Sequence, residues 1–205
     1  MYIEIDGQQM FYSTGNGSFS TDQPSVVFIH GAGLDHSVWV LPSRYFARHG
    51  YNVVSLDLPW HGRSQGQALN SIEEMASTVS ALIREIGISS AAVVGHSMGS
   101  LVALTLAANH GEQVRSLALL GTAVPMGVSD QLLAAAEANS HDAIDMSNMW
   151  SHSQAGQMGG NENPGMWMMG AEQRLLERAG KGVYFADFTA CNNFSMEVEL
   201  AGSIT

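Results

Sequence analysis

Positive charge is scarce in this chain of 205 residues, and the scarcity excludes several classes of partner. Eight Lys plus Arg stand against 19 Asp plus Glu, which gives a formal net charge of −11 at pH 7. No cluster of basic residues occurs anywhere in the sequence. Nucleic acids and anionic membranes are bound through a basic footprint, so we expect neither of them as a partner.

Leader segments, long apolar runs and paired cysteines are also missing. The opening Met1–Asp6 lacks the basic and apolar regions of a signal peptide, and no apolar run approaches the length of a membrane span. The single cysteine, Cys191, cannot form an internal disulfide, and no basic residue flanks it to activate the thiol. These absences predict a cytoplasmic protein with a buried, structural thiol.

The first 124 residues alternate short apolar runs with helical patterns, the rhythm of an α/β fold with a mostly parallel sheet. Near-continuous apolar runs predict central strands that are covered on both faces, at 26–30, 53–56, 91–95 and 117–120. Asp6-Gly7 predicts the tight turn of an opening hairpin between residues 2–5 and 10–14. We therefore interpret residues 1–124 as the core of the protein.

Helix signals follow between the predicted strands. Ser71 and Glu74 form a capping box before an apolar pattern that ends at Gly87, and residues 98–109 have almost no polar face, which predicts a buried helix.

The composition changes from Pro125 onward. Gly, Asn, Met and Trp become frequent, and six methionines fall between Met146 and Met169. Helical stretches remain legible at 130–138 and 171–179, and no strand does. We interpret residues 125–205 as a helical cap and its exit segment. Because methionine is flexible and polarizable, we expect some of these side chains to line a pliable apolar pocket.

A Gly-x-Ser-x-Gly pattern lies between the strand at 91–95 and the helix at 98–109, and it carries the strongest chemical signal. In Gly95-His96-Ser97-Met98-Gly99 the two glycines allow a turn so sharp that Ser97 adopts a strained backbone and presents its Oγ above the sheet. This context predicts that Ser97 is a catalytic nucleophile.

A glycine-rich loop after the strand at 26–30 supplies the second signal. In His30-Gly31-Ala32-Gly33 the small residues allow the backbone to approach a substrate closely. We expect the Ala32 and Met98 amides to form an oxyanion hole. His30, Gly31, Gly33 and His96 are predicted to border the substrate. Asp57 and His61, in Asp57-Leu-Pro-Trp-His-Gly-Arg-Ser64, are interpreted as loop residues, with Asp57 a turn carboxylate.

These three motifs, in this order and spacing, resemble the cap-bearing esterases, lactonases, carbon-carbon bond hydrolases and haloperoxidase-like enzymes of the α/β-hydrolase superfamily. The resemblance implies an α/β-hydrolase core with a helical cap, Ser97 as nucleophile, a tetrahedral intermediate at the Ala32 and Met98 amides, and no metal or organic cofactor. Serine at position 97 disfavours the dehalogenases and epoxide hydrolases of this superfamily, whose nucleophile is aspartate.

The superfamily order is serine, then acid, then histidine, and the last two are expected beyond residue 205. Residues 185–194 and 200–205 resemble the cap's exit and the approach to the next strand, and the remaining strands and helices would need roughly 50 to 70 residues. The histidines that are present are interpreted as poorly placed for the base, and Asp187 as a solvated carboxylate. We therefore expect a truncated chain with little Ser97-dependent turnover.

Three hypotheses follow for the function of the chain. The first is a serine hydrolase of small, largely apolar esters, lactones or related carbonyl compounds. The second is a non-catalytic protein that binds a ligand or partner on the hydrolase fold, and the third is one part of a split enzyme. An apolar edge strand at 117–120 also predicts a homodimer or larger assembly.

Overall fold

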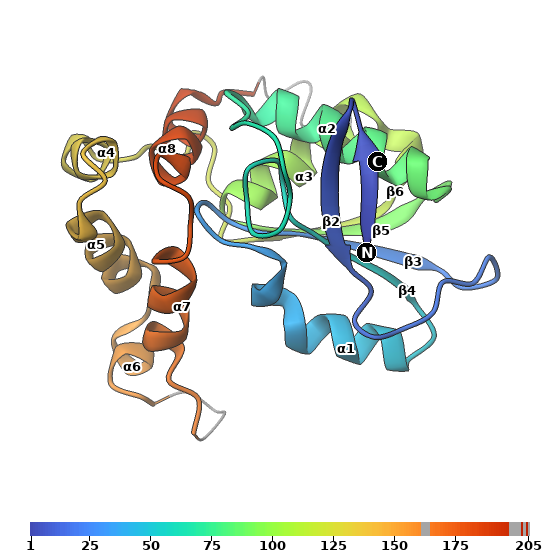
Figure 1. Ribbon diagram of the computed structural model, residues 1–205, viewed down its shortest axis with the longest axis horizontal. Helices are drawn as coiled ribbons and strands as arrows, with labels where there is room; N and C mark the ends of the chain where they lie inside the picture. Colours follow the sequence, from blue (N-terminus) through green and yellow to red (C-terminus); the bar gives the residue numbers. More distant parts are fainter. Residues whose placement is uncertain (161–164, 197–201, 203, 205) are drawn as a thin grey trace.

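A six-stranded sheet forms the centre of the molecule in the computed structural model, which describes residues 1–160, 165–196, 202 and 204 (Figure 1). The strand order is β1-β2-β4-β3-β5-β6. The central strands pair in parallel, while β1 and β2 form an antiparallel hairpin. The bounds are β1 (Tyr2–Ile5), β2 (Gln8–Ser13), β3 (Ser25–Ile29), β4 (Asn52–Leu56), β5 (Ala91–His96) and β6 (Val114–Leu120). The predicted mostly parallel sheet and its opening hairpin are thus confirmed.

Helices cover both faces of this sheet (Figure 1). The short η1 (His36–Trp39) and α1 (Val40–Arg48) lie on one face, and α2 (Ile72–Ile86) and α3 (Met98–Asn109) lie on the other, with η2 (Gly111–Gln113) leading into β6. Ser71 caps α2 as predicted, because the Glu74 amide donates to Ser71 Oγ, and Gly87 ends the helix at a φ of 84°. The other half of the predicted capping box differs, because the Glu74 carboxylate accepts the amide of Asn70 instead of that of Ser71. The sequence analysis did not identify α1.

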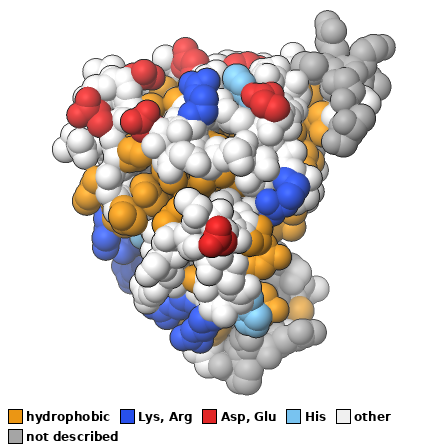
Figure 2. Space-filling view, turned by 90° about the vertical axis from the view of Figure 1, so that its right-hand side faces the viewer, with side chains coloured by type: hydrophobic (Ala, Val, Ile, Leu, Met, Phe, Trp, Pro, Cys, Tyr) orange, Lys and Arg blue, Asp and Glu red, His pale blue; other side chains and the backbone are white. Residues whose placement is uncertain are grey.

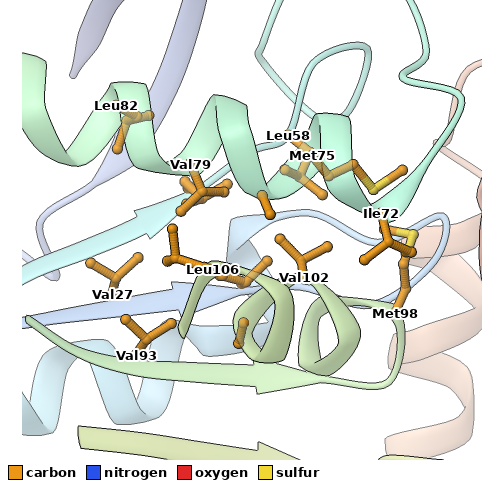
Figure 3. Close-up of a cluster of buried hydrophobic side chains, with 14 of the residues drawn as sticks. Val27, Leu58, Ile72, Met75, Val79, Leu82, Val93, Met98, Val102 and Leu106 are labelled. Carbon is orange, nitrogen blue, oxygen red and sulfur yellow. The ribbon is translucent and has the colours of Figure 1, made fainter. Parts of the chain in front are cut away.

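The main core lies between the sheet and the pair α2 and α3 (Figure 3). Val27 and Val93 project from neighbouring strands toward Val79 of α2 and toward Val102 and Leu106 of α3. Each of these side chains is fully buried. Packing on this scale stabilises a fold by about 25 cal/mol per Å² of apolar surface removed from water. The core therefore fixes α3 against β5, and the turn between them carries Ser97.

The part of the chain after β6 is a helical cap, and no strand occurs among its described residues. It comprises α4 (Asp130–Glu137), α5 (His141–Ser151), α6 (Gln154–Gln157), α7 (Met168–Leu176) and α8 (Val183–Asn193). Figure 1 places α4 to α7 away from the sheet and α8 next to it. The predicted helical character is confirmed.

Most of the methionines between Met146 and Met169 are exposed on the cap, so the expectation that some of them line an apolar pocket stays a prediction. Met149, Met158, Met166 and Met168 are all exposed, as are the neighbouring Trp150 and Trp167. These side chains sit on or beside α5, α6 and α7, at the end of the cap remote from the sheet (Figure 1). These four methionines therefore face outward, whereas Met146 packs against a small buried cluster within the cap.

The surface carries little concentrated charge on the face remote from the cap. Figure 2 shows Lys and Arg side chains scattered over this face, with acidic and apolar side chains between them. No helix in the described ranges is both long and apolar enough to cross a bilayer. The expectation that nucleic acid and membranes are not partners stays a prediction, as does the cytoplasmic location.

Candidate active site

Ser97 occupies the turn between β5 and α3 in a strained backbone conformation. Its φ is 52° and its ψ is −122°, a region that residues other than glycine rarely adopt and that costs on the order of 1 to 3 kcal/mol. The surrounding structure holds this conformation, because the Ser97 amide donates to the carbonyl oxygen of Leu120 (2.9 Å) and the Ser100 hydroxyl donates to the carbonyl oxygen of Ser97 (2.5 Å). The predicted elbow is confirmed.

The two glycines of the motif are required by backbone contacts. A Cβ at Gly95 would lie 2.1 Å from the carbonyl oxygen of Gly99, and a Cβ at Gly99 would lie 2.4 Å from that of Ile29. Both obstacles are backbone atoms, which cannot rotate away as a flexible side chain can. The strand, the helix and the neighbouring β3 therefore approach each other only because both positions lack a side chain.

The loop after β3 lies directly against this elbow. A Cβ at Gly31 would come within 3.3 Å of Ser97 Cβ. The amides of Ala32 and Met98 donate no hydrogen bond within the part of the chain that the structure describes, although both residues are buried. Backbone amides without a partner are rare in protein interiors. An oxyanion hole formed by these two amides stays a prediction.

His30 supports this loop from beneath. Its side chain is fully buried; the Leu58 amide donates to Nε2 (3.1 Å), and Nδ1 lies 2.9 Å from the carbonyl oxygen of Gly31. This pattern needs the neutral imidazole with its proton on Nδ1. Both ring nitrogens are engaged by the protein, so the imidazole has no nitrogen left for the substrate contact that the sequence predicted.

We expect the burial of His30 to make the protein sensitive to acid. Burial and the nearby His61 lower the pKa of His30 to about 4 from an ordinary value of 6.5. As the pH falls from 6.5 to 4 the unfolded chain takes up this proton before the folded chain does, so stability decreases, by about 3 kcal/mol in total. Chemical denaturation of wild type and of His30→Gln between pH 7 and pH 4 measures this. The glutamine keeps one donor and one acceptor, and equal pH slopes for the two proteins would contradict the expectation.

His61 and Asp187 form a buried ion pair that sequence reasoning missed. The two side chains are 3% and 1% exposed, and His61 Nε2 lies 2.8 Å from Asp187 Oδ2. His61 lies in the loop after β4, as predicted, but it is buried there. The interpretation of Asp187 as a solvated carboxylate was wrong, because this side chain is buried on α8. The residues are 126 positions apart, and no local pattern links them.

The surroundings of His61 favour its charged form. Nδ1 faces the carbonyl oxygen of Pro59 (3.0 Å) while Nε2 faces Asp187, so both ring nitrogens meet acceptors and both act as donors. Burial by itself would lower the pKa of His61, but the charge and hydrogen bond of Asp187 outweigh burial and raise it. The same Asp187 Oδ2 accepts the Gly33 amide (2.7 Å), which connects the pair to the loop beside Ser97.

Asp57 is a turn carboxylate, as the sequence predicted. It accepts the amides of His36 (2.6 Å) and Arg63 (2.9 Å) and contacts the His36 ring through Nδ1 (2.8 Å). Burial alone would raise the pKa of Asp57, but these hydrogen bonds outweigh the effect of burial and lower the pKa.

Asp35, His36 and Asp57 place three potential metal ligands within 4.8 Å of one another. Both Asp57 oxygens already accept hydrogen bonds, which accounts for this cluster without a metal.

None of the described residues lies where it could act as the base for Ser97. Ser97 Oγ makes no hydrogen bond to any of them, and the ring of His96 packs edge-on against Trp39, at 6.5 Å between ring centroids. A role for His96 at the substrate stays a prediction.

A cleft of about 270 Å³ lies on the other side of the Gly33 loop. It is bordered by Trp60–Arg63 and by the segment joining α7 to α8, and Ser97 does not line it.

Cys191 is buried on α8, and burial together with the charge of Asp187 raises the pKa of its thiol to about 12. The prediction that this thiol is buried is thus confirmed.

Comparison with known proteins gives a consistent result. Residues 24–165 match the family described as alpha/beta hydrolase fold. The chain is 38% identical over 130 residues to a dihydrolipoyllysine-residue acetyltransferase component of an acetoin cleaving system from Cupriavidus necator, over 63% of this chain and 33% of that protein. It is 32% identical over 114 residues to an (E)-2-((N-methylformamido)methylene)succinate hydrolase from Acinetobacter baylyi, over 55% of this chain and 41% of that protein. The matches therefore span less than half of either relative.

Solved structures agree with the sequence relatives on the fold. An enol-lactonase from Burkholderia xenovorans superposes with a TM-score of 0.80 at 22% identity, over 94% of this chain and 74% of that one. An esterase from Exiguobacterium antarcticum gives 0.77 at 19% identity, over 95% and 74%. Together with the elbow at Ser97 and the match over residues 24–165, this likeness shows that the chain belongs to the α/β-hydrolase family.

Proposed function

We propose that this chain carries the nucleophile and oxyanion hole of a serine hydrolase that acts on small, largely apolar carbonyl compounds. The observation that carries the proposal is the conformation of Ser97, strained at a φ of 52° beside the unpartnered amides of Ala32 and Met98. Strain of this kind persists where the surrounding structure enforces it and is concentrated at functional sites. An ester, a lactone or an activated carbon-carbon bond presents the carbonyl carbon that such a serine attacks.

The proposed reaction proceeds through an acyl-enzyme. Ser97 Oγ attacks the carbonyl carbon, its proton passes to a base, and the carbonyl oxygen becomes an oxyanion that accepts hydrogen bonds from the Ala32 and Met98 amides. Collapse of this tetrahedral intermediate expels the leaving group, and water then releases the acyl group from Ser97. Because no histidine among the described residues contacts Ser97 Oγ, the serine is a weak nucleophile in this arrangement. Turnover by this chain is therefore expected to be slow.

The substrate class is supported by the names of similar proteins and by the net charge of the chain. The enol-lactonase and the esterase are named for carbonyl substrates. The negative net charge disfavours strongly anionic substrates, which would be repelled at long range. A neutral, apolar ester or lactone is not repelled in this way.

Covalent acylation at Ser97 tests the proposal. We expect p-nitrophenyl acetate to transfer its acetyl group to Ser97, as seen by intact-mass and peptide spectrometry, at a rate well below the roughly 10 per second of a typical enzyme. Ser97→Ala should abolish the adduct, and the surface variant Ser89→Ala should not. An acetyl adduct on other residues but not on Ser97 would favour the non-catalytic alternative. Fast turnover that Ser97→Ala abolishes would reveal a base that the described contacts do not show.

We also propose that the chain self-associates through β6. Within the described residues this strand pairs only with β5 and forms one edge of the sheet, and Ala118 and Leu120 on it are exposed. An apolar edge strand is a template for pairing with a second copy. We expect sedimentation at micromolar concentration to show dimers or larger species, and Ala118→Lys to shift them toward monomer. A wild-type monomer across that range would contradict the proposal.

A further inference from the structure

We infer that Asp187 is a positioning residue through which the cap sets the geometry of the oxyanion loop, an inference that rests on the proposed function of Ser97. Asp187 belongs to α8, and its Oδ2 accepts the amide of Gly33. The peptide plane that contains this amide also contains the carbonyl of Ala32. The Leu34 amide also donates to the Gly31 carbonyl oxygen (3.2 Å). These two hydrogen bonds together hold the turn that presents the Ala32 amide.

One carboxylate oxygen joins three segments that are distant in the sequence. Asp187 Oδ2 contacts Gly33, which follows β3, and His61, which follows β4, while the aspartate itself belongs to the cap. The distances of 2.7 Å and 2.8 Å are those of charge-assisted hydrogen bonds, which are roughly twice as strong as neutral ones. His61 is held in turn by the carbonyl oxygen of Pro59. The acceptor for the Gly33 amide thus has little freedom to move.

A second side chain of α8 restricts the same turn. Tyr184 lies one helical turn before Asp187, and a Cβ at Gly33 would come within 2.7 Å of Tyr184 Cδ2. Gly33 also has a φ of +68°, a conformation that suits glycine. The Tyr184 hydroxyl hydrogen-bonds to Ser147 of α5. The ring and the carboxylate together place α8 over the oxyanion loop, so the loop geometry depends on the position of the cap.

This dependence has a functional consequence for the proposed reaction. An oxyanion donor acts only when it points at the place where the negative charge develops, and removing one donor costs about 10²- to 10³-fold in rate. A loop that is held by the cap offers its donor correctly only while α8 is seated. Asp187 contributes to the rate through this geometry and without contact with the substrate.

Hydrogen exchange at the Gly33 amide tests the inference without requiring turnover. In Asp187→Asn the acceptor loses its charge, so we expect this amide to exchange about tenfold faster than in wild type. Asp145→Asn is the matched control, because Asp145 also pairs with a histidine, His141, but on the exposed surface of the cap. It should leave the exchange within about twofold.

A second variant keeps the test decisive if Asp187→Asn fails to fold. His61→Gln leaves the carboxylate in place and removes its cationic partner, so exchange at Gly33 should again rise, by about threefold or more. Unchanged exchange at Gly33 in the folded variants would overturn the inference.

The rate of Ser97 acylation supplies the functional readout. In Asp187→Asn we expect the maximal acylation rate to fall about tenfold or more while the half-saturating ester concentration stays within about twofold, because the oxyanion is affected and the bound ester is not. Faster exchange at Gly33 with an unchanged acylation rate would also overturn the positioning role. Absence of any Ser97-dependent acylation in wild type would instead count against the proposed function, and the exchange data would still decide whether Asp187 holds the loop.

Discussion

Gly95→Ala should prevent stable folding of the core or cost about 3 kcal/mol or more of the free energy of unfolding. The new Cβ would lie 2.1 Å from the carbonyl oxygen of Gly99 and 2.7 Å from the Cα of Ser100, distances that real Cβ atoms do not show. Both contacts are with the first turn of α3, which is anchored in the main core by Val102 and Leu106. Relief therefore requires either a displaced helix or a distorted β5, and each of these changes disturbs buried packing.

Chemical denaturation monitored by circular dichroism measures this loss, and the chain offers a matched control. Gly111, just beyond the other end of α3, has open space where its Cβ would be and no positive φ. Gly111→Ala should therefore change the free energy of unfolding by no more than about 0.5 kcal/mol. A Gly95→Ala protein that unfolds within about 1 kcal/mol of wild type would show that strand and helix separate easily, and would contradict the account of the elbow.

Asp187→Ala should destabilise the protein by about 3 to 5 kcal/mol, the range for breaking a buried ion pair by removing one partner. The substitution leaves the His61 imidazolium buried opposite a methyl group and leaves the Gly33 amide without its acceptor. The pKa of His61 should then fall, because burial still acts on it while the charge that raised the pKa is gone. Titration of the ring resonances of His61 by NMR reports this change directly.

The exposed pair of His141 and Asp145 on α5 provides the comparison for this loss. Asp145→Ala removes a carboxylate from a histidine 3.1 Å away, but in solvent, and should destabilise the protein far less than Asp187→Ala. A double-mutant cycle with His61→Ala and Asp187→Ala should give a coupling free energy of about 2 kcal/mol. Additive effects of the two substitutions would mean that their contact contributes nothing specific to the fold.

Local patterns in the sequence were sufficient to predict the elbow. Gly95 and Gly99 bracket Ser97, and the strand before and the helix after them have their own periodicities, so the turn is specified within a few residues. The cap of α2 at Ser71 was predictable for the same reason. By contrast, α1 escaped recognition because its sequence contains Pro42, and a proline is ordinarily a sign of a turn unless it falls in the first turn of a helix, as here.

By itself, then, the sequence determined the family, the strand-to-helix turn and the serine, because each of these depends on neighbours along the chain. The tertiary structure alone decided that His61 and Asp187 meet, that Gly33 is held by α8, and that four methionines of the cap are exposed. A buried carboxylate has no local signature, since Asp187 is one of 19 acidic residues and its burial comes from packing between a cap helix and two core loops. The charge of His61 follows from the same packing, because only the folded chain brings Pro59 and Asp187 to opposite sides of its ring.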